Sequence, residues 1–447
     1  MSFNIGEFIS SIFDLTAGDY LASVWGTEPW VSVVLDILGI LIVATIPLLS
    51  VFFVGLIERK VLARMQDRIG PNRVGGKYGL LQMFADVVKM LTKELLVPAG
   101  ADKVAYFLAP VLSLATSALL FAVVPFAPGV IGTNLGVGVF YVLSISSVSV
   151  VALLLAGWGS NNKYALLGAF RAVAQLVSYE VPMILSLLVP IILASSMSTM
   201  DMVEAQAIPF VIFAPISALI FFVSSLAETG RSPFDLLEAE SEIVAGFHTE
   251  YSGMVFGLFM AAEYMGIMFM CFLFSTAYLG GYRFFGLEEI VLGNGFQLGR
   301  LLGLFITIFK GALVFFVFMW LRATLPRLRI DQLLNFNWKF MVPLMLMILL
   351  TVALLDRLIL DYIPQVGEAG RAGIHFVSNI IIGFAGLEVL RRSARRQRLR
   401  HNTTSPVLAV AENEGAPIYV ATEVEPAHDH HGHDHHGHDA HAPVPAH

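Results

Sequence analysis

Acidic residues crowd into one short stretch between two apolar segments of the chain. Residues 228–250 hold one cation, Arg231, against six carboxylates: Glu228, Asp235, Glu238, Glu240, Glu242 and Glu250. In water this stretch would be a solvated acidic surface. Apolar residues such as Phe234 and Ile243 are interleaved with the acids and favour packing instead. Crowded carboxylates in a low-dielectric site repel one another, so some retain protons near neutral pH, and a chain of such groups can pass protons.

Among the ionisable residues inside long apolar stretches, Arg171, Glu180, Glu263 and Lys310 stand out, whereas Asp36, Asp356 and Arg357 carry no functional prediction. A charge within a membrane is costly, so the default interpretation of such a residue is functional. Glu180 lies near the middle of its stretch, and Glu263 lies about three helical turns into another. Both carboxylates are therefore candidate functional residues.

Two basic segments adjoin apolar stretches. The first, ERKVLARMQDRIGPNRVGG (58–76), begins directly at the end of an apolar stretch and turns at GPN. The second carries Arg322, Arg327 and Arg329 with Asp331. Arg322 and Arg327 are five residues apart across a proline and need not share a helix face. Most such residues only anchor a helix at the membrane surface, but this arrangement could also hold a polar headgroup there.

Several kinds of site have no sequence signal. The chain has no nucleotide-binding loop, no zinc spacing and no nucleophile elbow. The single Cys271 permits neither an intrachain disulfide nor a cysteine-held metal centre. The tail ends in a His-rich run, in which metal binding by His430, His431, His435 and His436 is a weak alternative to a low-complexity segment. The composition is too apolar for a nucleic-acid binder.

Long apolar blocks must position these residues. The chain has 447 residues, of which 57% are hydrophobic and 14% charged, and its mean hydropathy is +0.76. Blocks of 20 or so residues suffice to cross a bilayer, and their repetition makes a soluble protein with buried helices a poor alternative. The predicted fold is an all-α polytopic membrane protein with eight to nine transmembrane helices, a surface amphipathic helix and a long acidic cytoplasmic loop. We expect spans near 31–57, 106–126, 138–158, 168–194, 208–227, 251–279, 301–323, 340–363 and 374–390.

The distribution of Lys and Arg predicts the topology, because cytoplasmic loops are enriched in them. Residues 58–105 are basic and should be cytoplasmic, which places the N-terminal segment 1–30 outside. Residues 31–363 would form the membrane domain, with cytoplasmic loops 58–105 and 228–250. A ninth span at 374–390 would place the tail 391–447, basic and then His-rich, in the cytoplasm. The N-terminus would then be extracytoplasmic, which means periplasmic if the chain lies in a bacterial inner membrane.

The surface helix is expected in YGLLQMFADVVKMLTKELL (78–96). Its apolar residues recur at helical spacing, while Gln82, Asp86, Lys89 and Lys93 occupy other faces. A helix lying along the membrane surface has this pattern.

At these places the sequence resembles the family of quinone-chamber membrane subunits (the H subunits) of respiratory complex I, the NADH:quinone oxidoreductase. The similar segments include ERKVLARMQDRIGPNRVG, SNNKYALLGAFRAVAQLVSYEVP, RSPFDLLEAESEIVAGF and RATLPRLRIDQLLNFNWK, in the family's order and within about residues 30–355. Where the family usually reads ETNRAPFDLPEAE, this chain has Gly230 for Asn and Leu237 for the second Pro. The family usually ends after eight spans, so the ninth stretch and the tail are additions.

The resemblance implies a membrane subunit of a proton-translocating oxidoreductase, with no complete active site on this chain. Its substrate would be ubiquinone or menaquinone, and flavin and iron–sulfur clusters would lie on partner subunits. The implied partners are the peripheral quinone-site subunits, the antiporter-like membrane subunits and lipids. The implied quinone-chamber residues are Arg59, Asp86, Arg322 and Arg327. The implied proton path comprises Glu180, Glu238, Glu240, Glu242, Glu250 and Glu263.

Two other functions remain open from the sequence. One is the equivalent subunit of a membrane-bound hydrogenase or ferredoxin-driven complex, which need not use quinone. The other is a stand-alone ion channel or secondary transporter. Many transporters contain an inverted internal repeat, and no convincing repeat is visible between the halves of this chain.

Overall fold

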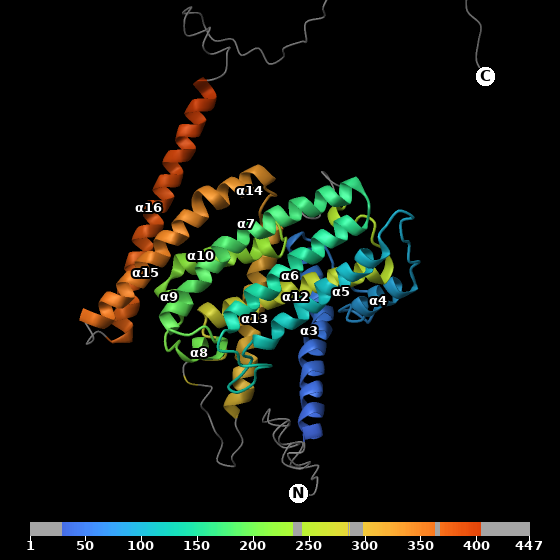
Figure 1. The fold of residues 1–447 in the computed structure, drawn as a ribbon, viewed down its shortest axis with the longest axis horizontal. Helices are drawn as coiled ribbons and strands as arrows, with labels where there is room; N and C mark the ends of the chain where they lie inside the picture. The colour runs from blue at the N-terminus through green and yellow to red at the C-terminus, as the bar shows by residue number, and fades with distance from the viewer. Residues whose placement is uncertain (1–28, 236–243, 285, 287–297, 363–366, 404–447) are drawn as a thin grey trace, which may run out of the picture. The chain divides into compact units, whose positions relative to one another are not determined.

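The computed structural model describes residues 29–235, 244–284, 286, 298–362 and 367–403. Eight helices in this part of the chain are long and apolar enough to cross a membrane. They are α3 (Pro29–Met65), α5 (Lys103–Leu120), α6 (Gly138–Gly159), α7 (Lys163–Ala194), α12 (Gly253–Tyr278), α13 (Leu298–Thr324), α15 (Val342–Tyr362) and α16 (Glu368–Thr403) (Figure 1). The chain is therefore an all-α polytopic membrane protein, as predicted.

One predicted span, 208–227, is built differently from the others. It consists of a short turn, α9 (Phe210–Phe213), and a 14-residue helix, α10 (Pro215–Glu228). Proline disfavours the helical conformation in the residue before it, and Ala214 accordingly has φ −136° and ψ 68°. Pro215 therefore starts a helix, whereas Pro47, Pro182 and Pro190 lie inside α3 and α7.

Shorter elements complete the described fold. The amphipathic helix α4 (Gln82–Thr92) starts four residues later than the apolar pattern suggested and has no buried residue. It lies against α3, where the rings of Phe52 and Phe84 stack with centroids 5.1 Å apart. The others are η1 (Phe121–Val123), α8 (Thr199–Glu204), η2 (Gly246–His248), α14 (Ile330–Phe336) and the π-helical turn η4 (Asn337–Met341), which continues from α14 into α15.

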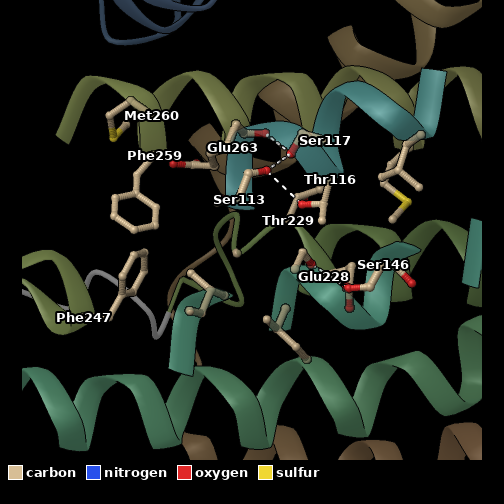
Figure 2. A pocket seen from close by; sticks show the side chains of 18 of the residues that line it. Ser113, Thr116, Ser117, Ser146, Glu228, Thr229, Phe247, Phe259, Met260 and Glu263 are labelled. Atoms are coloured by element: carbon tan, nitrogen blue, oxygen red, sulfur yellow. Dashed lines mark hydrogen bonds between the residues drawn. The ribbon is translucent and has the colours of Figure 1, made fainter. Parts of the chain in front are cut away.

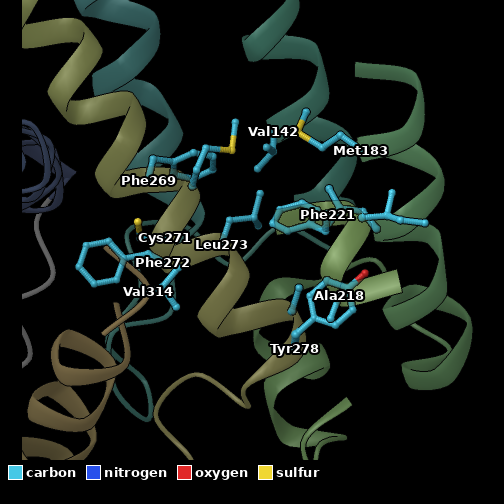
Figure 3. Packing of buried hydrophobic residues seen from close by; sticks show 14 of the residues in the cluster. Val142, Met183, Ala218, Phe221, Phe269, Cys271, Phe272, Leu273, Tyr278 and Val314 are labelled. Carbon is cyan, nitrogen blue, oxygen red and sulfur yellow. The ribbon is translucent and has the colours of Figure 1, made fainter. Parts of the chain in front are cut away.

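The main core lies where α7, α10 and α12 pack together. Figure 3 shows Phe221 of α10 beside Met183 of α7 and Leu273 of α12. Tyr278 is fully buried, donates its hydroxyl to Ser186 O at 2.7 Å and lies 2.9 Å from Ser217 Oγ. Because a buried hydroxyl without a hydrogen-bond partner is costly, these hydrogen bonds stabilise the contact among α7, α10 and α12.

A second, smaller core holds the end of the acidic segment against the bundle. Tyr251 stacks on Tyr106 of α5 with ring centroids 4.3 Å apart, and its hydroxyl donates to Tyr106 O. Phe247 and Phe259 pack against this pair. The chain comprises two compact units, Met1–Leu387 and Glu388–His447. The charged residues and the cavity that form the candidate site lie in the first unit.

Candidate functional site: a charge cluster and a carboxylate cavity

The end of α10 determines where Arg231 points. Gly230 adopts φ +60°, a left-handed conformation that suits glycine. Gly230 N donates to Ala227 O and Arg231 N donates to Leu226 O, which together form the Schellman motif that closes a helix.

Arg231 is the centre of a buried ionic cluster that joins three long helices. Its guanidinium donates to Glu58 Oε1 of α3 at 2.8 Å and lies 3.1 Å from Glu263 Oε1 of α12. Arg322 of α13 also donates to Glu58 Oε1. The guanidinium carbon of Arg231 lies over the ring of Tyr264, 5.0 Å from the centroid of that ring. We refer to Glu58, Arg231, Glu263 and Arg322 as the inner cluster.

Burial makes the charges of the inner cluster interdependent. Glu58 and Arg231 are only 3% and 6% exposed. Burial alone lowers the pKa of Arg231, but Glu263 and Glu58 outweigh it and raise that pKa above its ordinary value. Glu58 Oε2, Arg231 Nε and Arg231 Nη2 are buried without a hydrogen-bond partner among the described residues, although Nη2 lies 3.1 Å from Glu263 Oε1. The inner cluster thus shares its charges among several side chains, and three of its polar atoms make no hydrogen bond.

Two further ion pairs flank the inner cluster. Arg59, next to Glu58 on α3, contacts Asp86 of α4 at 2.5 Å, and Gln82 donates to the same carboxylate. Arg327, beyond α13, contacts Asp235 at 3.0 Å. The predicted quinone-chamber residues therefore take part in three separate contacts. Arg59 pairs with Asp86, Arg322 belongs to the inner cluster, and Arg327 pairs with Asp235.

The base of the acidic loop is fixed to α7. Gln175 is fully buried, and its amide nitrogen lies 2.8 Å from both Ala227 O and Phe234 O. Leu328 N donates to Pro233 O from the segment after α13. These bonds hold both sides of the turn that carries Arg231.

A polar cavity adjoins the inner cluster on the side of Glu263. It has a volume of about 130 Å³, enough for several water molecules, since one needs only about 10–15 Å³ of such space. Figure 2 shows Glu263 and Glu228 on different sides of it, with Ser113 and Thr116 between them. Its polar lining also includes Ser117, Ser146, Ser149, Thr229 and His248. Such a lining of hydroxyls and carboxylates can hold water by hydrogen bonds.

Glu180 lies one hydrogen bond beyond this cavity. Ser146, which lines the cavity, and Ser147 both donate to Glu180 Oε1, at 3.3 and 3.1 Å. Three carboxylates, Glu263, Glu228 and Glu180, are thereby connected through hydroxyl groups and space for water. Of the predicted proton path, the structure brings together Glu180 and Glu263.

Glu250 occupies a separate place. It accepts from Asn162 Nδ2 at 2.5 Å, at the start of α7, and does not line the cavity. His248, two residues before it, does line the cavity, and burial lowers the pKa of this imidazole to about 4. His248 is therefore neutral at physiological pH.

Several predicted residues lie outside the described part of the chain. They are Glu238, Glu240 and Glu242 of the proposed proton path, and His430, His431, His435 and His436 of the weak metal site. Among the described residues, no group of three or more His, Cys, Asp or Glu side chains is placed to hold a metal ion.

Sequence reasoning missed the hydroxyl lining and the central position of Arg231. Serines and threonines are common in apolar helices, and nothing in their spacing distinguished Ser113, Thr116 and Ser146. Arg231 did carry a signal, because it is the single cation in the 228–250 stretch. Lys310, another intramembrane charge, donates to three main-chain carbonyls, those of Leu279, Gly281 and Arg283.

The fold and the site define a class: a polytopic helical membrane subunit with a shared charge cluster beside a carboxylate-lined cavity. Residues 38–353 match the NADH dehydrogenase family. The chain belongs to this family, and its resemblance to the H subunits of respiratory complex I is confirmed.

Individual relatives show the same similarity. The H subunit of the NADH-quinone oxidoreductase of Dehalococcoides mccartyi (strain CBDB1) is 47% identical over 291 residues, covering 65% of this chain and 78% of the relative. The corresponding subunit from Chlorobaculum tepidum is 47% identical, covering 68% of this chain and 89% of the relative. That of Geobacillus kaustophilus is 44% identical, covering 72% and 93%.

Proposed function

We propose that this chain is the membrane subunit of an NADH:quinone oxidoreductase that forms the membrane side and entrance of the quinone-reduction chamber. In this proposal it also connects quinone reduction to proton translocation through its buried carboxylates. Membership of the family supports the first part. The second rests on one observation: Glu263 belongs both to the inner cluster and to the lining of the polar cavity.

The inner cluster would respond to the charge of the quinone. Reduction of a quinone consumes two electrons and two protons, so negative charge develops at the headgroup before protons arrive. Arg59, Arg322 and Arg327 supply cations on the side of the cluster predicted to face the chamber, with Asp86 orienting Arg59. Buried charges interact far more strongly than charges in water, so a charge at the headgroup would redistribute the attraction that Arg231 shares between Glu58 and Glu263.

Proton movement would follow from this redistribution. While Arg231 lies against Glu263, the cation favours the ionised carboxylate. If Arg231 turns toward Glu58, Glu263 loses part of this support and can accept a proton. Water in the cavity and the hydroxyl groups would carry protons among Glu263, Glu228 and Glu180, the last reached through Ser146. Glu238, Glu240, Glu242 and Glu250 remain proposed members of the path.

The rest of the enzyme would supply the redox chemistry. NADH oxidation requires flavin and iron–sulfur clusters, which we assign to partner subunits, and the quinone would be ubiquinone or menaquinone. Peripheral quinone-site subunits would meet the chain near Arg59 and Arg327, and antiporter-like subunits would receive the coupling signal. The basic connections would be cytoplasmic, with a periplasmic N-terminus and a cytoplasmic tail in a bacterial inner membrane.

Replacement of single carboxylates tests the coupling role. Glu180→Gln keeps the size of the side chain and an acceptor for Ser146 and Ser147, but cannot carry a proton. Inhibitor-sensitive NADH:quinone reduction and the linked proton uptake should fall roughly tenfold to hundredfold, while NADH oxidation by an artificial acceptor stays unchanged. Glu263→Gln should act in the same direction.

The matched control is Glu204→Gln, an exposed carboxylate at the end of α8. It should leave both activities at the wild-type level. Equal loss of quinone reduction and artificial-acceptor activity in Glu180→Gln, with normal assembly of the complex, would contradict the proposed role.

A further inference from the structure

The last described helix, α16, contacts the bundle through a regular series of residues. Arg371, His375, Asn379, Gly383 and Gly386 follow one another at intervals of four, four, four and three residues. This spacing places them along one face of a helix. His375 and Asn379 are fully buried, whereas Val377, Ile381 and Phe384 between them are 56–70% exposed. One face of α16 is therefore adapted to protein and the other to lipid.

The first two residues of this series, Arg371 and His375, contact a buried carboxylate. Arg371 Nε donates to Asp356 Oδ1 of α15 at 2.8 Å, and His375 Nε2 lies 3.3 Å from the same oxygen. Asp356 is only 6% exposed. Without α16 this carboxylate would face lipid, where an ionised side chain is costly.

The remainder of the series reaches α15 and the break between α9 and α10. Asn379 Nδ2 donates to Phe213 O at 3.2 Å, and the ring of His375 lies 6.0 Å from that of Phe213. A methyl group added at Gly383 would lie 2.8 Å from Ile216 Cδ1, and one at Gly386 would lie 2.8 Å from Leu344 Cδ1. The glycines thus let α16 approach two elements at once.

These contacts are of the kind that gives helix association in membranes its specificity. Apolar side chains gain little by leaving lipid for another helix, so small residues and interhelical hydrogen bonds determine which helices pair. The family match ends at residue 353. Asp356 and all five residues of the α16 series therefore lie beyond the matched segment, although Phe213, Ile216 and Leu344 lie within it.

We propose that Asp356, Phe213 O, Ile216 and Leu344 form a helix-binding site, and that its partner is α16, recognised by the series Arg371, His375, Asn379, Gly383 and Gly386. Binding depends on the Asp356–Arg371 contact and does not need the covalent connection between α15 and α16. The site accepts an apolar helix with a cation, an imidazole, a carboxamide and two glycines on one face, and it excludes lipid from Asp356.

Cleavage of the connection in the full-length chain tests this inference. A protease site is inserted between Tyr362 and Gly367, and an affinity tag follows His447. After cleavage in mild detergent, the larger fragment should remain with α16 during capture through the tag. Asp356→Asn and Arg371→Gln should each lower the retained fraction roughly threefold to twentyfold after dilution, as expected for loss of an interhelical polar contact.

Two further variants make the result decisive. The exchange Asp356→Arg with Arg371→Asp should restore part of the retention, because it rebuilds the ion pair in reverse. Thr351→Val is the matched control, because Thr351 is only half-buried on α15 and its hydroxyl donates to Met347 O of its own helix. If Asp356→Asn fails to accumulate, Arg371→Gln gives the same comparison without altering α15. Separation of the wild-type fragments on cleavage, or wild-type retention in both single variants, would overturn the proposal.

Discussion

Two buried charge clusters in this protein solve the problem of charge in a membrane in different ways. In the inner cluster Arg231 is shared by Glu58 and Glu263, and Glu58 is shared by Arg231 and Arg322. At the α15–α16 contact, one carboxylate, Asp356, receives one guanidinium and one imidazole. We refer to Asp356, Arg371 and His375 as the outer contact. The inner cluster adjoins a cavity with room for water, whereas the outer contact joins α15 and α16.

The difference suggests what each cluster can do. A charge with a single strong counter-ion has one favourable arrangement, so it fixes the helices that carry it. A charge shared by two opposite partners has at least two arrangements of similar energy, and an external charge can select between them. A cation shared by two carboxylates therefore suits a switch, and a carboxylate held by one guanidinium with an imidazole beside it suits a structural contact.

Removal of Arg231 should have the largest effect. Arg231→Gln leaves the buried Glu58 and the half-buried Glu263 with less compensation, and breaking a buried ion pair from one side costs about 3–5 kcal/mol. The melting temperature of the chain in detergent and the yield of assembled complex should both fall, and quinone reduction should be lost.

The same change at the outer contact sharpens the comparison. Arg371→Gln leaves a single carboxylate with His375 still beside it, so the melting temperature should fall less than in Arg231→Gln. If Arg231→Gln and Arg371→Gln lose equal stability while both retain quinone reduction, the proposed difference between the inner cluster and the outer contact is wrong.

A smaller effect is expected from His248 beside the cavity. Its pKa is lowered to about 4 in the folded chain from an ordinary value of 6.5. The unfolded chain therefore binds a proton between these pH values that the folded chain does not, and stability falls as pH drops from about 6.5 to about 4. The loss reaches at most about 3 kcal/mol.

His248→Phe should remove this pH dependence, because phenylalanine can occupy the same aromatic environment beside Phe247 and Phe256 without titrating. The measurement is the difference in melting temperature between pH 7.5 and pH 5, which should be smaller in the variant. An unchanged difference would mean that other groups dominate the acid sensitivity.

The smallest effect should come from the tail. Deletion of the residues after about 401 removes the His-rich run and none of the residues that form the two charge clusters. Assembly and quinone-reduction turnover should stay near the wild-type level, which makes this variant a baseline for the others. Loss of activity that added zinc or nickel restores in the full-length chain would instead assign the tail a metal-dependent role.

The sequence predicted the fold well because its signal is local. Apolar blocks reveal membrane-spanning helices one at a time, and all eight long helices were expected near their observed positions. Among the predicted spans, 208–227 differs most, because Pro215 and the residue before it interrupt the apolar stretch and divide it into α9 and α10.

The candidate site was predicted less completely because its interactions are not local. Motifs drew attention to Arg59, Asp86, Glu263 and Arg322, but nothing in the sequence shows that Arg231 lies between Glu58 and Glu263, which are 205 residues apart in the chain. The cavity was missed for a related reason. Its lining hydroxyls come from several helices, and each is ordinary in its own segment.

The attachment of Gln175 has a mechanical consequence. Its side chain holds both Ala227 O and Phe234 O, so the base of the loop and this part of α7 move as one body. Glu180 lies five residues further along the same helix, or about 7.5 Å at the usual rise per residue. A displacement of the turn that carries Arg231 would therefore displace this part of α7 as well. It would shift Glu180 relative to Ser146 and Ser147 on the neighbouring helix α6.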